Sequence, residues 1–181
     1  MNRALLLMGG KERRPFIIEV NTSLSGTSAS NQFIIPVDVL AGFRYKIKTS
    51  DGQSISNISG NYTVNFPTAG VYTIEIYEQT RNAGGFRINF NNGGDCLKLT
   101  KILQFGDVNW RGFNNSFYGC SNLSMSYVVD APKITSTSFA NTFRGCSSIT
   151  NFPYLSSWDV SSVTNMQIMF NGCTSFNQTL S

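Results

Sequence analysis

The feature that most constrains this chain is a short motif, aromatic–x–Gly–Cys, that occurs three times in its second half. The copies begin at Phe117, Phe143 and Phe170, so they are 26 and 27 residues apart. The glycines and cysteines follow at the same intervals: Gly119, Gly145, Gly172, Cys120, Cys146 and Cys173. A fixed period of about 20–50 residues indicates stacked units, because one such unit cannot bury its hydrophobic face alone.

Another large apolar residue stands four positions before each aromatic residue: Phe113, Phe139 and Met166. This spacing places both side chains on one face of a short helix, and the glycine then stands where such a helix ends. Residues 96–99, Cys-Leu-Lys-Leu, match the end of the motif and are expected to form a degenerate capping unit. The pattern predicts a leucine-rich-repeat solenoid of three to four repeats with short helices over residues 93–181.

Residues 15–92 follow a different pattern, in which short runs alternate apolar and polar side chains, as at Phe16, Ile18 and Val20. Further runs cover residues 32–38, 43–49, 61–66, 71–78 and 86–90, with turn-forming segments between them. Pro36 interrupts its run and predicts an edge strand or a bulge there. We therefore expect a mainly β protein, with an immunoglobulin-like antiparallel β-sandwich over residues 15–92 preceded by an arm of residues 1–14.

The last repeat, WDVSSVTNMQIMFNGCTSFNQTLS, resembles the repeat of BspA-like leucine-rich-repeat surface proteins of bacteria and some phages. The segments GDVNWRGFNNSFYGCSNL and FANTFRGCSSI are looser versions of that repeat. In the first half, NYTVNFPTAGVYTIEIY is similar to a strand pair of polycystic-kidney-disease (PKD)-type sandwich domains. Asp51 and Gly52 match the loop of those domains, but its tryptophan is missing. Together, the similarities imply an adhesive or protein-binding surface protein without catalytic activity.

The four cysteines allow three interpretations. A zinc site needs paired ligands a few residues apart and commonly uses histidine, but these cysteines are 24–27 residues apart and the chain has no histidine. A disulfide stays open, because neighbouring turns of a solenoid lie roughly 4.8 Å apart. One residue repeated at one place in every turn favours a ladder of buried, reduced cysteines.

Catalytic residues are hard to find in this sequence. Without histidine, the usual base for a serine or cysteine nucleophile is missing, and the ten carboxylates form no close cluster. A pair of carboxylates assembled by the fold, as in a glycosidase, stays open as a remote alternative. The segment NNGGD, residues 91–95, offers oxygen ligands for calcium, but a turn between the two domains is the favoured interpretation. We predict no catalytic residues, no metal and no cofactor.

The net charge of +4 is too evenly spread to predict nucleic-acid binding, since the only basic cluster is Lys11, Arg13 and Arg14. No apolar run approaches the ~20 residues of a membrane span, and residues 4–8 are too short for a secretion signal. The basic arm is a candidate docking surface. Phe176 and Leu180 lie where a solenoid normally carries a polar cap. Either they fold back, or a partner or another copy of the chain covers them, or the natural chain was cut. Our hypothesis is that this end is a second candidate interface.

The expected function is attachment or display through the solenoid and loop surfaces, on a phage virion exterior or a bacterial cell surface. Its expected partners are proteins of the virion or cell surface and, as a further candidate, a host-surface glycan. The alternative is a purely structural virion component, such as a capsid decoration or tail protein. A carbohydrate-active enzyme is the remote third class.

Overall fold

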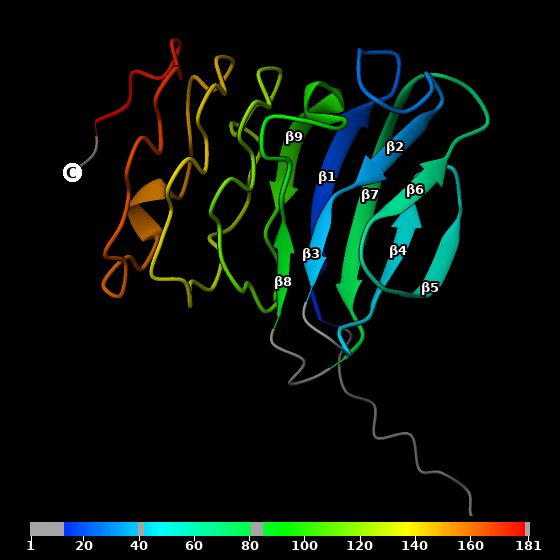
Figure 1. The fold of residues 1–181 in the computed structure, drawn as a ribbon, viewed down its shortest axis with the longest axis horizontal. Helices are drawn as coiled ribbons and strands as arrows, with labels where there is room; N and C mark the ends of the chain where they lie inside the picture. Colours follow the sequence, from blue (N-terminus) through cyan, green and yellow to red (C-terminus); the bar gives the residue numbers. More distant parts are fainter. Residues whose placement is uncertain (1–12, 40–41, 81–84, 180–181) are drawn as a thin grey trace, which may run out of the picture.

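The structure of the chain is a computed structural model that describes residues 13–39, 42–80 and 85–179. These residues form a mainly β fold, as the sequence predicts, with nine strands and two short 3-10 helices (Figure 1). The strands are β1 (Phe16–Asn21), β2 (Gln32–Ile35), β3 (Val37–Val39), β4 (Tyr45–Thr49), β5 (Ser54–Ile58), β6 (Tyr62–Asn65), β7 (Val71–Glu78), β8 (Phe86–Ile88) and β9 (Leu99–Gln104). The helices are η1 (Cys96–Lys98) and η2 (Leu155–Ser157).

The largest sheet has five strands in the order β5-β4-β7-β1-β9, and every neighbouring pair is antiparallel. In β1, Phe16, Ile18 and Val20 are fully buried and alternate with partly exposed residues. This alternation is the reason why the sequence identifies the strand, since successive side chains of a strand point to opposite faces of the sheet.

Two smaller antiparallel sheets, β2–β6 and β3–β8, complete the first half of the chain. Pro36 separates β2 from β3, which lie in different two-stranded sheets. The predicted single run is therefore two short strands, and each is an edge strand, as expected beside a proline. Aromatic contacts join the small sheets to the large one: the rings of Phe16 in β1 and Phe86 in β8 are 6.1 Å apart. Phe66, just after β6, stacks on Tyr72 of β7 at 3.9 Å.

The sequence did not predict two of these strands, β5 and β9. Apolar and polar residues alternate only weakly in β5, whose sequence is SISNI. Three of its five residues are exposed, and only Ile58 is buried. Strand β9 follows the predicted boundary at residue 92 but pairs with β1, with Val20 opposite Leu99. The last strand of the large sheet is thus also the start of the region that follows, and the boundary at residue 92 stays a prediction.

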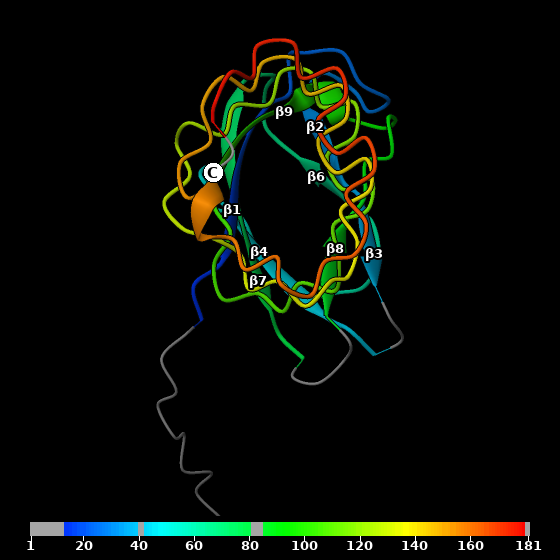
Figure 2. The same ribbon diagram turned by 90° about the vertical axis from the view of Figure 1, so that its left-hand side faces the viewer.

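The chain from residue 105 to residue 179, which we call the stacked region, runs in successive turns that lie one on the next (Figure 2). Isolated parallel bridges join consecutive turns, at Trp110 with Ile134 and at Ser138 with Asn165. The same parallel arrangement begins beside the sheets, where Phe86 bridges to Trp110 and Lys101 to Ser124. The periodic motif thus corresponds to a regular stacking of the backbone.

The prediction of short helices around Phe113, Phe139 and Met166 is wrong, because these segments are runs of tight turns. The N–H of Ser116 donates to the carbonyl of Phe113, three residues back, but the N–H of Phe117 donates to Thr142 in the next turn. An α-helix requires each of these N–H groups to bond four residues back. Donation to the neighbouring turn therefore replaces the helix.

Candidate functional site

The glycines of the motif allow the turns to approach closely. Gly119, Gly145 and Gly172 have φ of +83°, +73° and +79°, in the left-handed region that favours glycine. A Cβ atom on Gly119 would lie 2.3 Å from Oδ1 of Asn92, and one on Gly172 would lie 3.3 Å from Cα of Gly145. A glycine that ends a helix commonly has a positive φ, so the expected helix ends implied this conformation. In the structure, however, these glycines allow tight turns and close packing between turns.

The aromatic residues of the motif form columns through the stacked region. The rings of Phe113 and Phe139 stack at 5.0 Å, and those of Phe117 and Phe143 at 5.5 Å. Phe143 in turn stacks on Phe170 at 5.6 Å. Each inner ring is fully buried, so the repeated aromatic residue fills the interior of its turn.

All four cysteines are free and buried. The thiol of Cys146 donates to the carbonyl oxygen of Phe117 at 3.1 Å, and that of Cys173 to Phe143 at 3.0 Å. Burial raises the pKa of the Cys120 and Cys146 thiols well above the ordinary value, and that of Cys173 to about 11. Thiols held in this state are protonated near neutral pH and serve as packing groups rather than nucleophiles.

One row of backbone hydrogen bonds joins each turn to the following turn, while other bonds run back to the preceding turn, as from Ser148 to Ser121 and from Thr164 to Thr137. The N–H groups of every second residue in one turn donate to carbonyl oxygens of the next turn, over distances of 2.7, 3.1, 3.0 and 2.8 Å. The donors are Phe139, Asn141, Phe143 and Gly145, and the acceptors are Asn165, Gln167, Met169 and Asn171. The equivalent donors of the last turn are Met166, Ile168, Phe170 and Gly172. Within residues 13–39, 42–80 and 85–179, no carbonyl or side chain accepts from these four.

The side chains of the last turn are also unlike those of the inner turns. Met166 stands where the inner turns have Phe113 and Phe139, and 46% of its surface is exposed. Ile168 has φ of +49° and stands where the inner turns have Asn115 and Asn141, which share that conformation. Val160 and Ile168 are exposed as well, and we call Val160, Met166 and Ile168 the end face.

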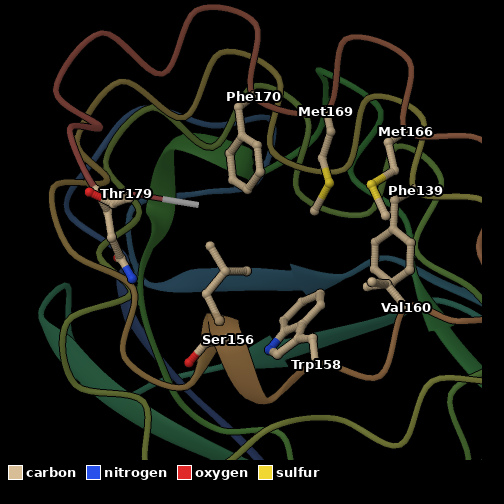
Figure 3. Close-up of a pocket in the computed structure, with 10 residues that line it drawn as sticks. Phe139, Ser156, Trp158, Val160, Met166, Met169, Phe170 and Thr179 are labelled. Atoms are coloured by element: carbon tan, nitrogen blue, oxygen red, sulfur yellow. The ribbon is translucent and has the colours of Figure 1, made fainter. Parts of the chain in front are cut away.

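A cavity of about 300 Å³ opens beside the end face (Figure 3). Its walls are mainly apolar and include Trp158, Val160, Met166, Met169 and Phe170. In the close-up, the two methionines and Phe170 lie on one side of the cavity, and Trp158 lies opposite them. A cavity of this size and lining suits an apolar group such as a large aliphatic or aromatic side chain.

The predicted interface residues have mixed outcomes. Lys11 and Leu180 lie outside the described residues. Arg13 pairs with Glu78 at 2.9 Å, and Arg14 pairs with Asp107 and Asp130 at 3.0 and 3.2 Å, so both guanidinium groups bond within the protein itself. Phe176 is partly buried and stacks on Phe170 at 4.9 Å.

The carboxylate of Asp95, at the end of the NNGGD segment, is buried and fully engaged by the protein. It accepts hydrogen bonds from the hydroxyl and N–H of Ser28 and from the N–H of Ile34. Burial acts to raise its pKa, but these bonds and the charge of Lys98 together lower it. The ammonium group of Lys98 donates to oxygens of Ser28, Ala29 and Gln32 within 3.0 Å. The cluster thus fastens the loop before β2 to η1, and Asp95 has no spare oxygen directed at solvent for calcium.

Ile168, Val160, Trp158 and the cavity were missed by sequence reasoning. One signal was present, namely an isoleucine at the position where the two preceding copies of the motif have asparagine. The remaining cavity residues lie between motifs, and their convergence is a result of the stacking alone. In the described part of the chain, no three His, Cys, Asp or Glu side chains are grouped as a metal site requires. Nor does that part contain a helix with the length and hydrophobicity needed to cross a membrane.

The fold and the site define a mainly β protein whose C-terminal half is built of stacked turns and ends in an exposed apolar face. Residues 111–181 match the model of a family described as "Mycoplasma protein of unknown function, DUF285". The match covers most of the stacked region and less than half of the chain. No curated protein and no solved structure shows significant similarity to the chain.

Proposed function

We propose that this protein is a non-enzymatic attachment or display protein that binds other proteins through its stacked region and loops. The observation that carries the proposal is the repeated turn. Its phenylalanines, glycines and cysteines are used to pack one turn on the next, which leaves the outward positions free to serve recognition. The stacked region also matches a family associated with BspA-like surface repeat proteins.

In finer detail, we assign residues 93–181 to a BspA-like leucine-rich-repeat solenoid and residues 15–92 to an immunoglobulin- or PKD-like sandwich. The parallel bridges between turns and the antiparallel pairing of the first eight strands support these assignments. We place the protein on a phage virion exterior or on a bacterial cell surface, where repeat proteins of this kind attach to protein or glycan partners.

The second candidate is a purely structural component of a virion, such as a capsid decoration or tail protein. The exposed residues Val160 and Met166, which line one mainly apolar cavity, favour it, because an exposed apolar surface suits a contact that is permanently covered in a particle.

The two functions differ in what the isolated protein binds. Labelled protein is added to intact cells of the bacterium concerned and, separately, to proteins from dissociated phage particles, with heat-unfolded protein as the control. An attachment protein binds intact cells, whereas a structural component binds only particle proteins. Release of sugars from a panel of surface glycans would instead establish an enzyme and overturn both.

A further inference from the structure

We propose that Tyr127, Val129 and Tyr154, on the flank of the stacked region, bind a neutral glycan whose sugar rings stack on the two tyrosine rings. We call these three residues the tyrosine surface. The inference rests on the proposed function and deepens it, by naming a binding surface and the chemical class of its ligand. Two observations carry it: exposed tyrosines at equivalent positions of neighbouring turns, and surroundings in which the charges cancel.

The two tyrosines occupy the same place in successive turns. Tyr127 and Tyr154 are 27 residues apart, and each directly precedes a residue whose N–H donates to the carbonyl three residues back, at 3.2 and 3.3 Å. The donors are Val128 and Leu155, and the acceptors are Met125 and Phe152. The hydroxyl of Ser126 donates to the carbonyl of Asn151 at 3.4 Å, so the two tight turns are direct neighbours.

Tyr127 is exposed although its turn has a neighbour on both sides. The turn of Tyr154 follows it, and β9 precedes it, since the N–H of Ser124 donates to the carbonyl of Thr100 at 2.8 Å. Tyr127 and Val129 are nevertheless each 57% exposed, with a buried residue between them. Their exposure therefore results from the outward direction of their side chains and not from the place of this turn in the stack.

The ring of Tyr127 is held by a neighbour whose charge is compensated. Nζ of Lys101 lies 4.5 Å from the centre of the ring, in a cation–π contact that fixes the orientation of the ring. The same ammonium group pairs with the carboxylate of Glu19 at 3.1 Å, so the two charges cancel. A nucleic acid or another polyanion therefore gains no net attraction from this pair. Sugar hydroxyls, in contrast, suit a neutral pair of donors and acceptors.

Tyr154 has an unusual backbone conformation for a bulky residue. Its φ is +64°, in the left-handed region that residues other than glycine adopt uncommonly. It is 48% exposed, and its side chain makes no hydrogen bond or ring contact with the part of the chain that the structure describes, so core packing does not account for it. Strain of this kind concentrates at functional sites. Figure 2 shows η2, which directly follows Tyr154, on the wall of the stack that continues from β1.

A glycan fits the tyrosine surface better than a protein partner does. A stable protein interface uses roughly 20–30 residues on each side around an apolar centre, whereas the three exposed side chains here are flanked by Ser126 and the Lys101–Glu19 pair. A tyrosine ring stacks well on the apolar C–H face of a sugar ring. Neighbouring turns lie roughly 4.8 Å apart, close to the length of one sugar unit in an extended chain. The best match is a linear glycan of β-linked glucose or N-acetylglucosamine, whose equatorial hydroxyls leave both ring faces flat.

The test titrates the full chain with cellotetraose and with tetra-N-acetylchitotetraose. Maltotetraose is the control probe, because its α-linked chain curves and does not follow a straight row of rings. Isothermal titration calorimetry measures affinity, and saturation-transfer NMR detects contact between tyrosine ring protons and sugar C–H protons. We expect saturable binding of at least one β-linked tetrasaccharide with transfer to its C–H protons, and binding of maltotetraose about tenfold weaker or less.

Matched variants separate the tyrosine surface from other aromatic residues. Tyr127→Ala is expected to weaken binding of the β-linked tetrasaccharide about tenfold, whereas Tyr127→Phe keeps the ring and should stay within about threefold of the original chain. Tyr118→Ala is the control, because the guanidinium group of Arg144 already lies over that ring, at 4.9 Å, and it should leave binding unchanged. Thermal unfolding confirms that each variant is folded.

Three results would each overturn the proposal: no binding of either β-linked tetrasaccharide, no transfer to sugar C–H protons, or equal affinities of Tyr127→Ala and Tyr118→Ala. If neither tetrasaccharide binds and Tyr127→Ala abolishes binding to a virion or cell-surface protein, the surface is a protein interface instead.

The outcome for the tyrosine surface is distinguishable from that for attachment. If cells or virion proteins bind the original chain and Tyr127→Ala equally well, and no tetrasaccharide binds, attachment stands and the tyrosine surface fails. If a β-linked tetrasaccharide binds through Tyr127 but neither cells nor virion proteins bind the chain, the tyrosine surface stands and the attachment function fails.

Discussion

The inner turn at residues 139–146 and the last turn at residues 166–173 have the same motif and nearly the same backbone. Gly145 and Gly172 differ by only a few degrees in φ, and Asn141 and Ile168 are both left-handed. Their surroundings are very different, because the inner turn is covered on both sides and the last turn on one side only. Phe143 is fully buried, whereas Phe170 is only partly buried. The comparison teaches that the motif determines the path of the chain, while burial depends on the neighbouring turns.

The largest expected difference is in the free energy of unfolding, between removal of the Phe143 ring and removal of the Phe170 ring. Phe143→Ala removes a ring that stacks on Phe117 and Phe170, and it should lower the free energy of unfolding by about 3–5 kcal/mol. Phe170→Ala removes a ring from the open end and should cost about 1–2 kcal/mol, since less apolar surface is lost from the core. Urea denaturation measures both, and equal costs would break the comparison.

The left-handed position offers a reciprocal exchange of residues. Asn141→Ile places a β-branched residue at φ of +57° and should destabilise the chain by about 1–2 kcal/mol. Ile168→Asn relieves the same strain at φ of +49° and should stabilise the chain by about 1 kcal/mol, although it removes an apolar group. The thermal midpoints of the two variants should therefore move in opposite directions. Parallel shifts would show that the strain is not what distinguishes the two positions.

The buried thiols make stability depend on alkaline pH. Burial raises the folded-state pKa of Cys173 to about 11, whereas an unfolded thiol titrates near ~8.5. Below that pH, both states hold the proton and the stability contribution is complete. Above it, the unfolded chain releases protons that the folded chain keeps, so stability is lost as the pH rises toward the folded pKa.

We expect each such thiol to contribute a loss of about 1 kcal/mol for the first pH unit above ~8.5. Urea denaturation at several pH values measures this slope, and Cys173→Ala should make it shallower than in the original chain. An unchanged slope in the variant would contradict the raised pKa of Cys173.

The rate of thiol labelling should be highest for the cysteine that is least buried by the neighbouring turns. Cys173 is 9% exposed, whereas Cys120 and Cys146 are fully buried. With iodoacetamide under native conditions, mass spectrometry should find Cys173 modified first, and Cys120 and Cys146 modified only as fast as the chain unfolds. Uniform labelling of all three would mean that the stacked region opens as a whole.

Part of the fold was predictable because it depends on patterns within short segments of the sequence. The alternation at Phe16, Ile18 and Val20 predicted β1, and Pro36 predicted an edge strand or a bulge because proline cannot donate to a strand pairing. The prediction of helices failed at Phe113 and Phe117, because spacing by four residues fits a helix and a run of turns equally well. What separates the two is where the N–H of Phe117 finds its acceptor, and that acceptor is 25 residues away at Thr142.

The sequence by itself determined the period, the glycine positions and the buried aromatic columns, because these follow from steric limits and hydrophobicity at each residue. Only the tertiary structure decided that β9 pairs with β1, that Asp95 and Lys98 engage the loop at Ser28, and that Trp158, Met169 and Phe170 surround one cavity. Those contacts join residues far apart in the chain, and their free energy exists only after the turns have stacked. The end face has the same origin, since its donors have no acceptor among the described residues only because Met166 to Gly172 form the last described turn of the stack.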